Sequence, residues 1–295
     1  MKYVFGPVNS RRLGVSLGID VVPLKVCSFN CIYCECGVTT ELTDEVKEYF
    51  PYEEIISEIS QVLDKRPEID VVTFSGSGEP TLNSRLGDII RHIKTNFPEY
   101  KIAVLTNSSL LYRDDVRIGL LQADIIYPSL DAVSEAVFNK IMRPLPGLNS
   151  QSIIDSITLL RNEFKGILCL EIFIIAGLND TEDELSKLKA ACIKINPDEI
   201  HLNNLDRPGA EEWVKPSDLE NLERIKKYFT PLPVKLIGRV QGSHRPADYY
   251  EELESLILEV IDKDGSTAEE LSVHLNMRLF DVKRALKNLK MKDKL

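Results

Sequence analysis

Short apolar runs alternate along this chain with longer segments in which apolar residues recur every three or four positions. The short runs are rich in β-branched residues and are followed by glycine or polar residues, a pattern typical of buried strands that end in loops. The periodic segments between them predict amphipathic helices. The predicted strands cover residues 15–22, 69–75, 101–106, 124–130, 167–176, 199–203 and 234–237, and the predicted helices cover residues 53–63, 85–95, 152–163, 183–194 and 217–228.

This alternation predicts an α/β fold, because a strand that is followed by a helix and another strand normally pairs in parallel with its successor. The pattern amounts to about six βα units. We therefore expect a partial TIM-type (β/α)6 barrel rather than the usual eight-fold barrel.

The pattern changes near Ala247, after which no strand signal remains. Residues 248–262, 267–275 and 279–289 predict three short helices, and the tight turn around Asn276 and Met277 resembles a helix-turn-helix. The sequence thus predicts two domains, a partial barrel over residues 1–246 and a small all-helical domain over residues 247–295.

Composition narrows the class of protein. The chain has 295 residues, is 43% hydrophobic and carries a formal net charge of −10, so it can bury a large core but does not attract nucleic acid over its whole surface. The opening residues do not resemble a signal peptide, and the longest apolar run, residues 167–178, is too short to span a bilayer. We expect no membrane association and a cytoplasmic location.

Residues 277–295 depart from the acidic average, because they hold seven Lys and Arg against two Asp. A basic helix of this kind in a helix-turn-helix would suit nucleic-acid phosphate. The alternative is a small docking domain with a solvated basic face.

Three cysteines carry the strongest chemical signal. Cys27, Cys31 and Cys34 follow the spacing CxxxCxxC, with Tyr33 directly before the third. Three thiolates at this spacing can hold three corners of a 4Fe–4S cluster and leave the fourth iron open to a small molecule. A zinc site that uses Cys36 as a fourth thiol is the alternative, although zinc ribbons usually take their ligands from two separated pairs. Cys169 and Cys192 lie in an apolar strand and a helix, as buried core residues do.

Further candidates lie where the predicted strands end, since the sites of parallel α/β barrels form there. The second strand ends in Ser77-Gly78-Glu79, where glycine lets the backbone approach a ligand and carbonyls can accept hydrogen bonds from an ammonium group. An ordinary tight turn is the alternative. The third strand ends at Asn107, which could equally be a helix cap.

The later strands end in the same way. Alternation places Ser129 and Asp131 on one face, where both could bond a ribose hydroxyl. Gly177 lies in a turn of small residues where a flat base could rest on backbone amides, and Asn203 opens a polar cluster at the sixth strand end. Each of these segments could also be an ordinary surface loop.

Taken together, the CxxxCxxC loop with Tyr33, the Ser77-Gly78-Glu79-Pro80 motif, the Ser129/Asp131 pair and the Gly177 turn resemble the radical S-adenosylmethionine (radical SAM) superfamily over residues 15–240. Ser77 stands where the second motif usually has glycine. Residues 5–14 and 31–37 resemble a group of Fe–S oxidoreductases that is distantly similar to the wybutosine-synthesising tRNA enzymes. Those enzymes carry a second cluster, and this sequence has no second cysteine trio.

The resemblance implies an enzyme in which Cys27, Cys31 and Cys34 hold the cluster and S-adenosylmethionine chelates its open iron. An electron from an external donor of the flavodoxin or ferredoxin type would cleave S-adenosylmethionine to a 5′-deoxyadenosyl radical, which abstracts a substrate hydrogen. The cofactor-binding residues would then be Tyr33, Ser77, Gly78, Glu79, Asn107, Ser129, Asp131, Gly177 and Asn203.

Four arginines are candidates for anchoring the substrate: Arg11, Arg12, Arg143 and Arg207. Surface salt bridging is the alternative for each of them. The sequence leaves open whether the substrate is a small metabolite or a macromolecule. The alternative function is a non-enzymatic Fe–S or zinc regulator that binds nucleic acid through its C-terminal helices.

Overall fold

An eight-stranded sheet forms the centre of the molecule. The computed structural model describes residues 2–237, 246–261, 266–275, 277, 279–292 and 294–295. The sheet has the strand order β1-β2-β5-β6-β7-β8-β9-β10, in which β1 (Val4–Ser10) runs antiparallel to β2 (Gly14–Ile19) and the other neighbours are parallel. The remaining strands are β5 (Val71–Phe74), β6 (Lys101–Thr106), β7 (Ile125–Pro128), β8 (Ile167–Phe173), β9 (Glu199–Asn203) and β10 (Val234–Leu236).

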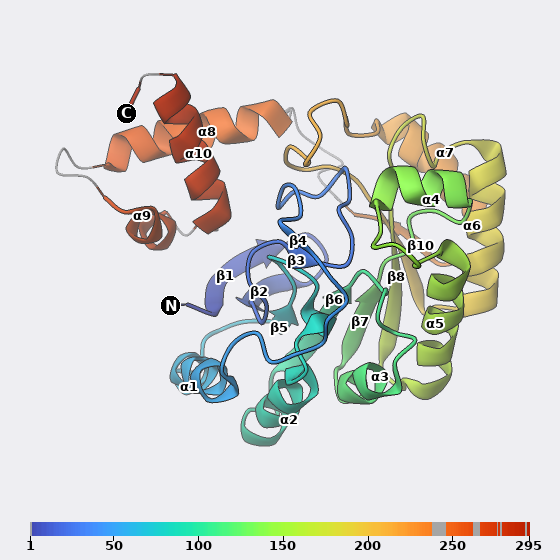
Figure 1. The fold of residues 1–295 in the computed structure, drawn as a ribbon, viewed down its shortest axis with the longest axis horizontal. Coiled ribbons are helices and arrows are strands. Elements are labelled where there is room, and N and C mark those ends of the chain that lie inside the picture. The colour runs from blue at the N-terminus through green and yellow to red at the C-terminus, as the bar shows by residue number, and fades with distance from the viewer. Residues whose placement is uncertain (1, 238–245, 262–265, 276, 278, 293) are drawn as a thin grey trace.

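Every connection between consecutive parallel strands carries at least one helix, and Figure 1 shows these helices around the outside of the curved sheet. The α/β fold with a largely parallel sheet is thereby confirmed, and it is consistent with a partial TIM-type barrel. The helices are α1 (Tyr52–Leu63), α2 (Leu86–Asn96), α3 (Asp114–Leu120), α4 (Glu135–Met142), α5 (Ser150–Glu163), α6 (Glu182–Ile195) and α7 (Leu219–Phe229).

The main core lies between the sheet and these helices. Outward-facing strand residues such as Leu17, Val72 and Phe74 are fully buried, as are Ile59 of α1 and Ile89 of α2. The apolar alternation of the strands and the periodicity of the helices predicted these two faces, because each element must bury one of them. Five predicted helices therefore correspond to α1, α2, α5, α6 and α7.

Strand β1 is absent from the sequence predictions, because Gly6 and Pro7 interrupt its apolar pattern. Pairing with β2 creates this strand, with Val4 opposite Ile19 and Phe5 opposite Gly18. A β-carbon on Gly18 would lie 2.0 Å from Cζ of Phe5, so the ring occupies space that only glycine leaves open. The sequence also did not predict the short helices α3 and α4, or the two-residue strands β3 (Val26–Cys27) and β4 (Glu41–Leu42).

Three C-terminal helices lie beside the sheet: α8 (Pro246–Val260), α9 (Ala268–His274) and α10 (Leu279–Met291) (Figure 1). They share an apolar cluster of their own, which includes Leu253, Ile257, Leu271 and Leu289. The predicted turn around Asn276 and the residues just before the predicted boundary at 246/247 lie outside the described residues. No helix in the described part of the chain is long and apolar enough to cross a membrane.

Candidate active site

The three cysteines of the CxxxCxxC motif lie in the segment between β2 and α1, with Cys27 at the end of the two-residue strand β3 and Cys31 and Cys34 after it. Residues 27–36 are called the cysteine loop below. The Cys34 N–H donates to the Cys31 carbonyl at 3.1 Å, which makes this part of the loop a tight turn. Burial raises the pKa of Cys27 to about 11 and that of Cys31 well above its ordinary value, and the neighbouring thiolates of the motif add to both shifts. Metal ions that displace thiol protons would fit this set of three thiols.

Lys25 supplies a positive charge at the third cysteine. Its Nζ donates to Cys34 Sγ at 3.0 Å, and the side chain is buried. A hydrogen bond from Cys36, followed by the Lys25 ammonium group, holds the pKa of Cys34 down at about 5 despite burial. Burial alone would lower the pKa of Lys25, but the cysteine thiolates raise it above its ordinary value. This ammonium group would offset the negative charge of a thiolate-bound cluster.

Cys36 connects the cysteine loop to the end of β5. Its Sγ lies 3.4 Å from the Gly76 carbonyl oxygen, which competes with Cys34 for the single thiol proton. The contact with Gly76 gives the Cys36 thiol a structural role that does not involve a metal. That Cys36 is not a cluster ligand stays a prediction.

The Ser77-Gly78-Glu79 motif packs directly against the cysteine loop. Asp20, which the sequence analysis missed, accepts hydrogen bonds from the Ser77 N–H at 3.1 Å and from its Oγ at 3.0 Å. The Ser77 carbonyl accepts the backbone N–H of Lys25 at 2.5 Å. A β-carbon on Gly78 would lie 2.2 Å from the Val26 carbonyl oxygen, so glycine is required for this close approach.

Glu79 ties the ends of β5 and β6 together. Its Oε1 accepts from the hydroxyls of Thr81 at 2.5 Å and Thr106 at 2.7 Å, and its Oε2 accepts the Asn107 N–H at 2.7 Å. Burial raises the pKa of Glu79, although these donors oppose the shift. Asn107 is held in turn against the first cysteine, with its Nδ2 3.4 Å from Cys27 Sγ and 2.9 Å from Ser28 Oγ. Glu79 thus holds Asn107 in place, and Asn107 in turn contacts the cysteine loop at Cys27 and Ser28.

Tyr33 and Asp131 are brought together by the fold. The Tyr33 hydroxyl donates to Asp131 Oδ2, the Phe173 N–H donates to Oδ1 at 2.7 Å, and the Tyr33 ring stacks on Phe173 with centroids 4.1 Å apart. Burial raises the pKa of Asp131 to about 7. Both carboxyl oxygens therefore have protein partners, so a ribose contact by Asp131 stays a prediction. Ser129 lies beside Glu171 of β8, and its role is likewise still a prediction.

Gly177 and Asn203 lie at the ends of neighbouring segments. Gly177 has φ +78°, donates its N–H to Asp180 Oδ1 at 2.7 Å, and has open space where a β-carbon would be. This open space agrees with the predicted small-residue turn. Asn203 is buried, and its Nδ2 donates to Glu171 Oε1 at 3.1 Å. This hydrogen bond directs the Asn203 side chain towards β8.

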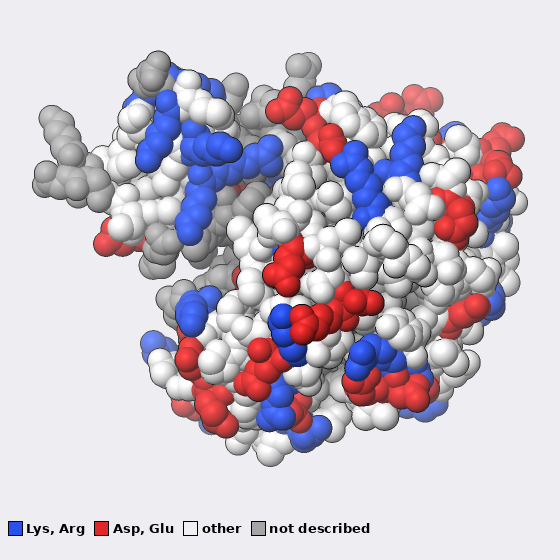
Figure 2. All heavy atoms as spheres, viewed as in Figure 1, with Lys and Arg blue, Asp and Glu red and all other residues white. Residues whose placement is uncertain are grey.

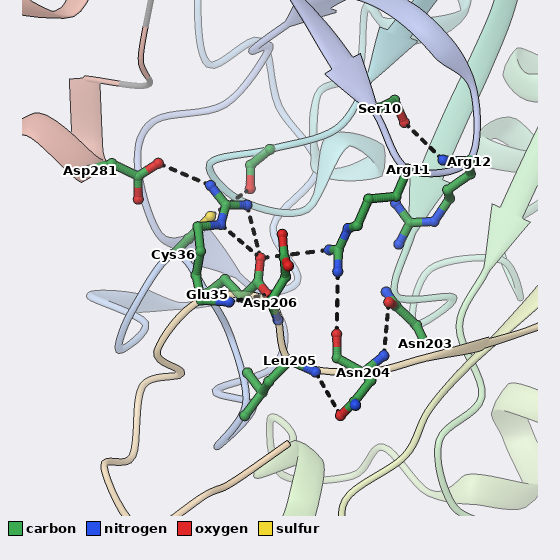
Figure 3. Close-up of polar contacts among 12 residues, drawn as sticks. Ser10, Arg11, Arg12, Glu35, Cys36, Asn203, Asn204, Leu205, Asp206 and Asp281 are labelled. Atoms are coloured by element: carbon green, nitrogen blue, oxygen red, sulfur yellow. Dashed lines mark hydrogen bonds and ion pairs between the residues drawn. The ribbon is translucent and has the colours of Figure 1, made fainter. Parts of the chain in front are cut away.

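The four candidate anchoring arginines all face acidic side chains of the chain. Arg12 pairs with Glu171, and Arg143 pairs with Glu211. Arg11 and Arg207 both reach Glu35 Oε2, at 3.8 and 2.8 Å (Figure 3). In this structure all four arginines therefore form salt bridges within the chain. That they anchor a substrate stays a prediction.

Glu35 is a connecting residue that the sequence analysis missed. It lies between Cys34 and Cys36 and accepts the backbone N–H groups of Asp206 at 2.8 Å and Arg207 at 3.1 Å. Burial alone would raise its pKa, but the guanidinium groups of Arg207 and Arg11 hold it below the ordinary value. Arg207 also reaches Asp281 of α10 at 3.0 Å, so one arginine links the cysteine loop to a C-terminal helix (Figure 3). The sequence signal that could have found Glu35 is a carboxylate directly after the third cysteine of the motif.

Comparison with known proteins identifies the class to which this fold and these cysteines belong. Residues 21–189 match the family described as the Radical SAM superfamily, so the chain belongs to that superfamily and is a radical SAM enzyme. This class binds a 4Fe–4S cluster and S-adenosylmethionine. The alternative of a non-enzymatic regulator is therefore not supported.

Within the superfamily, the chain belongs to the UPF0026 family. It is 34% identical over 249 residues to the UPF0026 protein of Methanocaldococcus jannaschii, a match that covers 82% of this chain and 77% of that protein. It is also 40% identical over 228 residues to a Brachyspira hyodysenteriae protein named GTPase Obg. That match covers 77% of this chain but only 33% of the Brachyspira protein.

Solved structures show the same fold at low sequence identity. SuiB from Streptococcus suis, bound to S-adenosylmethionine, superposes with a TM-score of 0.56 and 16% identity over 75% of this chain and 50% of SuiB. TYW1 with a lysine-pyruvate adduct bound gives a TM-score of 0.53 and 19% identity over 74% of each chain. TYW1 is thus a distant structural neighbour, and these likenesses support the fold alone.

Proposed function

We propose that this radical SAM enzyme holds its cluster through Cys27, Cys31 and Cys34. The carrying observation is the Lys25 ammonium group, which lies 3.0 Å from Cys34 Sγ and whose pKa is raised by the thiolates of all three cysteines. When bound, the cluster and S-adenosylmethionine supply the electron transfer and the carbon–sulfur bond cleavage. In this proposal the chain binds and orients them, and Lys25 compensates the negative charge.

In the same proposal, the strand ends around the cysteine loop bind S-adenosylmethionine. The Gly76 and Ser77 carbonyls face the cysteine loop, where they contact Cys36 Sγ and the Lys25 N–H, and their remaining lone pairs would receive the methionine ammonium group. Ser129 would meet the ribose, and the open space at Gly177 would accept the adenine. Asp131 and Phe173 would hold Tyr33 as a rigid wall that excludes water.

Binding of S-adenosylmethionine to anaerobically reconstituted protein tests this assignment. We expect Ser129→Ala to weaken the affinity measured by calorimetry without loss of iron. Ser57→Ala, on the exposed side of α1, is the matched control and should bind as wild type does. Equal affinities in the two variants would remove Ser129 from the site. In wild type, dithionite should release 5′-deoxyadenosine, which chromatography detects.

We also propose that the enzyme acts on nucleic acid that α10 recruits, which would agree with a distant relation to the wybutosine-synthesising tRNA enzymes. Lys283, Lys287 and Lys290 of α10 are exposed, and Figure 2 shows Lys and Arg side chains gathered over the C-terminal helices. Asp281, on the same helix, contacts Arg207, which binds Glu35 in the cysteine loop. Asp281 and the three lysines lie on opposite faces of α10, so α10 would contact the cysteine loop through one face and present its lysines to phosphate on the other.

The separate apolar cluster of α8, α9 and α10 supports treating residues 247–295 as a small helical domain. A cytoplasmic location and an external one-electron donor of the flavodoxin or ferredoxin type complete the proposal, since cluster thiols need a reducing compartment.

Salt-dependent binding of RNA to the full-length protein tests recruitment by α10. The double variant Lys283→Glu/Lys287→Glu should weaken binding and flatten its dependence on salt, because each lost phosphate contact lowers the logarithmic slope by about 0.7–0.9. The control variant Lys226→Glu/Lys227→Glu changes two exposed lysines on α7 and makes the same change in charge. If both variants bind RNA equally well, α10 does not recruit it, and a small-molecule substrate is favoured.

A further inference from the structure

We infer that Cys169, Glu199 and His201 form a zinc site at the end of the partial barrel opposite the cysteine loop. Each of the three offers one ligand atom, and these atoms all lie within 4.8 Å of one another. This site is separate from the cluster motif, and neither the superfamily match nor the proposed function assigns it a role.

Parallel pairing of β8 and β9 creates this cluster of side chains. Cys169 is in register with Glu199, and Glu171 is in register with His201 two positions further along. Because side chains alternate along a strand, Cys169, Glu199 and His201 all project from the same face of the sheet. Glu199 is the first residue of β9, whereas the cysteine loop follows the C-terminal end of β2, so the two sites lie at opposite ends of the parallel strands.

The His201 imidazole is buried and faces Glu199 through one of its two ring nitrogens. His201 is only 3% exposed, and its Nδ1 has no hydrogen-bond partner among the described residues. Its Nε2 lies 2.8 Å from Glu199 Oε2. Burial also lowers the pKa of His201, which favours the neutral imidazole that binds metals.

The donor set favours zinc over other common ions. One thiol, one imidazole and one carboxylate are borderline-soft ligands that suit tetrahedral Zn²⁺, whereas Ca²⁺ and Mg²⁺ prefer oxygen ligands alone. Zinc bonds of about 2.0–2.3 Å place tetrahedral ligands about 3.3–3.8 Å apart. The three ligand atoms lie within 4.8 Å of one another, and Glu199 Oε2 and His201 Nε2, now 2.8 Å apart, would separate slightly to admit the ion. Water could fill the fourth position, as in open zinc sites.

The contact between Lys235 and Glu199 bears on how the ion would enter. The Lys235 Nζ donates to Glu199 Oε1 at 2.6 Å, but its side chain is 59% exposed and can withdraw into solvent. The Glu199 side chain is 31% exposed, so this ligand of the proposed site can be reached from solvent. Burial raises the pKa of Cys169 to about 11, so zinc would displace the thiol proton into solvent as it binds, with no change of oxidation state.

Metal uptake by the full-length holoenzyme tests the inference. Iron is measured in every sample, which shows that the cluster cysteines stay occupied, and the protein is then titrated with Co²⁺ as a visible probe for zinc. We expect wild type to bind one Co²⁺ per chain with a thiolate charge-transfer band, and Zn²⁺ to displace it. His201→Gln and Cys169→Ala should each weaken this binding by about 100-fold or more, since lost direct ligands matter at least as much as lost supporting contacts.

Cys192→Ala is the matched control, because Cys192 is an equally buried cysteine in α6, away from the proposed ligands. It should bind Co²⁺ as wild type does. His201→Gln preserves a hydrogen-bonding side chain, and circular dichroism confirms that each variant is folded. Equal uptake by wild type and folded His201→Gln, or no uptake by wild type beyond its iron, would overturn the zinc site. Cys169 would then be a packing residue among Val71, Ala103 and Tyr127.

Discussion

The ammonium group of Lys25 lies 3.0 Å from the sulfur of Cys34, although the two residues are nine positions apart. The Lys25 backbone adopts the left-handed conformation, with φ +61°, and its N–H is fixed by the Ser77 carbonyl. The loop therefore turns a buried lysine towards the cluster motif, where its charge can influence the metal.

Lys25→Met should lower the reduction potential of the cluster. Removing a positive charge next to a thiolate ligand disfavours the more negative reduced state, and we expect a decrease of about 60 mV, which is a factor of ten for a one-electron couple. Electron paramagnetic resonance during a redox titration measures the shift. Lys47→Met changes an exposed lysine and should leave the potential unchanged. Equal potentials in the two variants would contradict the role of Lys25.

Alanine at Cys27, Cys31 or Cys34 should abolish the cluster, because each removes one of three ligands. Cys36→Ala should keep its iron, since that thiol already contacts the Gly76 carbonyl oxygen, and Cys169→Ala should keep its iron because Cys169 lies in the middle of β8. Iron and sulfide analysis after anaerobic reconstitution distinguishes the two groups. Iron near the wild-type level in Cys31→Ala would refute the assignment.

Gly78→Ala should disturb the cysteine loop. A β-carbon would lie 2.2 Å from the Val26 carbonyl oxygen, so Val26 and its neighbour Cys27 must move. We expect a loss of stability of about 1–3 kcal/mol in urea unfolding, together with reduced iron. Gly177→Ala is the comparison, because it meets no atom within 4 Å and strains only the backbone at φ +78°. It should keep its iron, and equal iron loss in both variants would exclude the steric explanation.

Asp131→Asn should change how stability depends on pH. Burial raises the pKa of Asp131 to about 7 in the folded protein, above the ordinary value of 3.8. Between about pH 4 and pH 7 the folded state therefore holds a proton that the unfolded chain has lost. The stability that this carboxyl group contributes is present in full below about pH 4 and is lost as the pH rises through about 7. The stability of Asp131→Asn relative to wild type should thus increase from pH 5 to pH 8 in urea unfolding. A difference that is the same at both pH values would show that Asp131 has an ordinary pKa.

The sequence by itself determined the features that depend on local spacing. Cys27, Cys31 and Cys34 lie within one loop, so their separation along the chain limits how far apart their sulfurs can be. The alternation of apolar strands and periodic helices likewise determined the parallel sheet, because each element must bury its apolar face. The turn of small residues at Gly177 was also readable, since a positive φ favours glycine.

Only the tertiary structure decided which distant side chains meet. Glu35 and Arg207 are 172 positions apart, and nothing local in either segment indicates their ion pair. Cys169 and His201 come together because β8 and β9 are neighbours in one particular register, and β1 becomes a strand only through its pairing with β2. Strand order and register depend on how the whole core packs, so a one-residue shift would turn every one of these side chains to the opposite face.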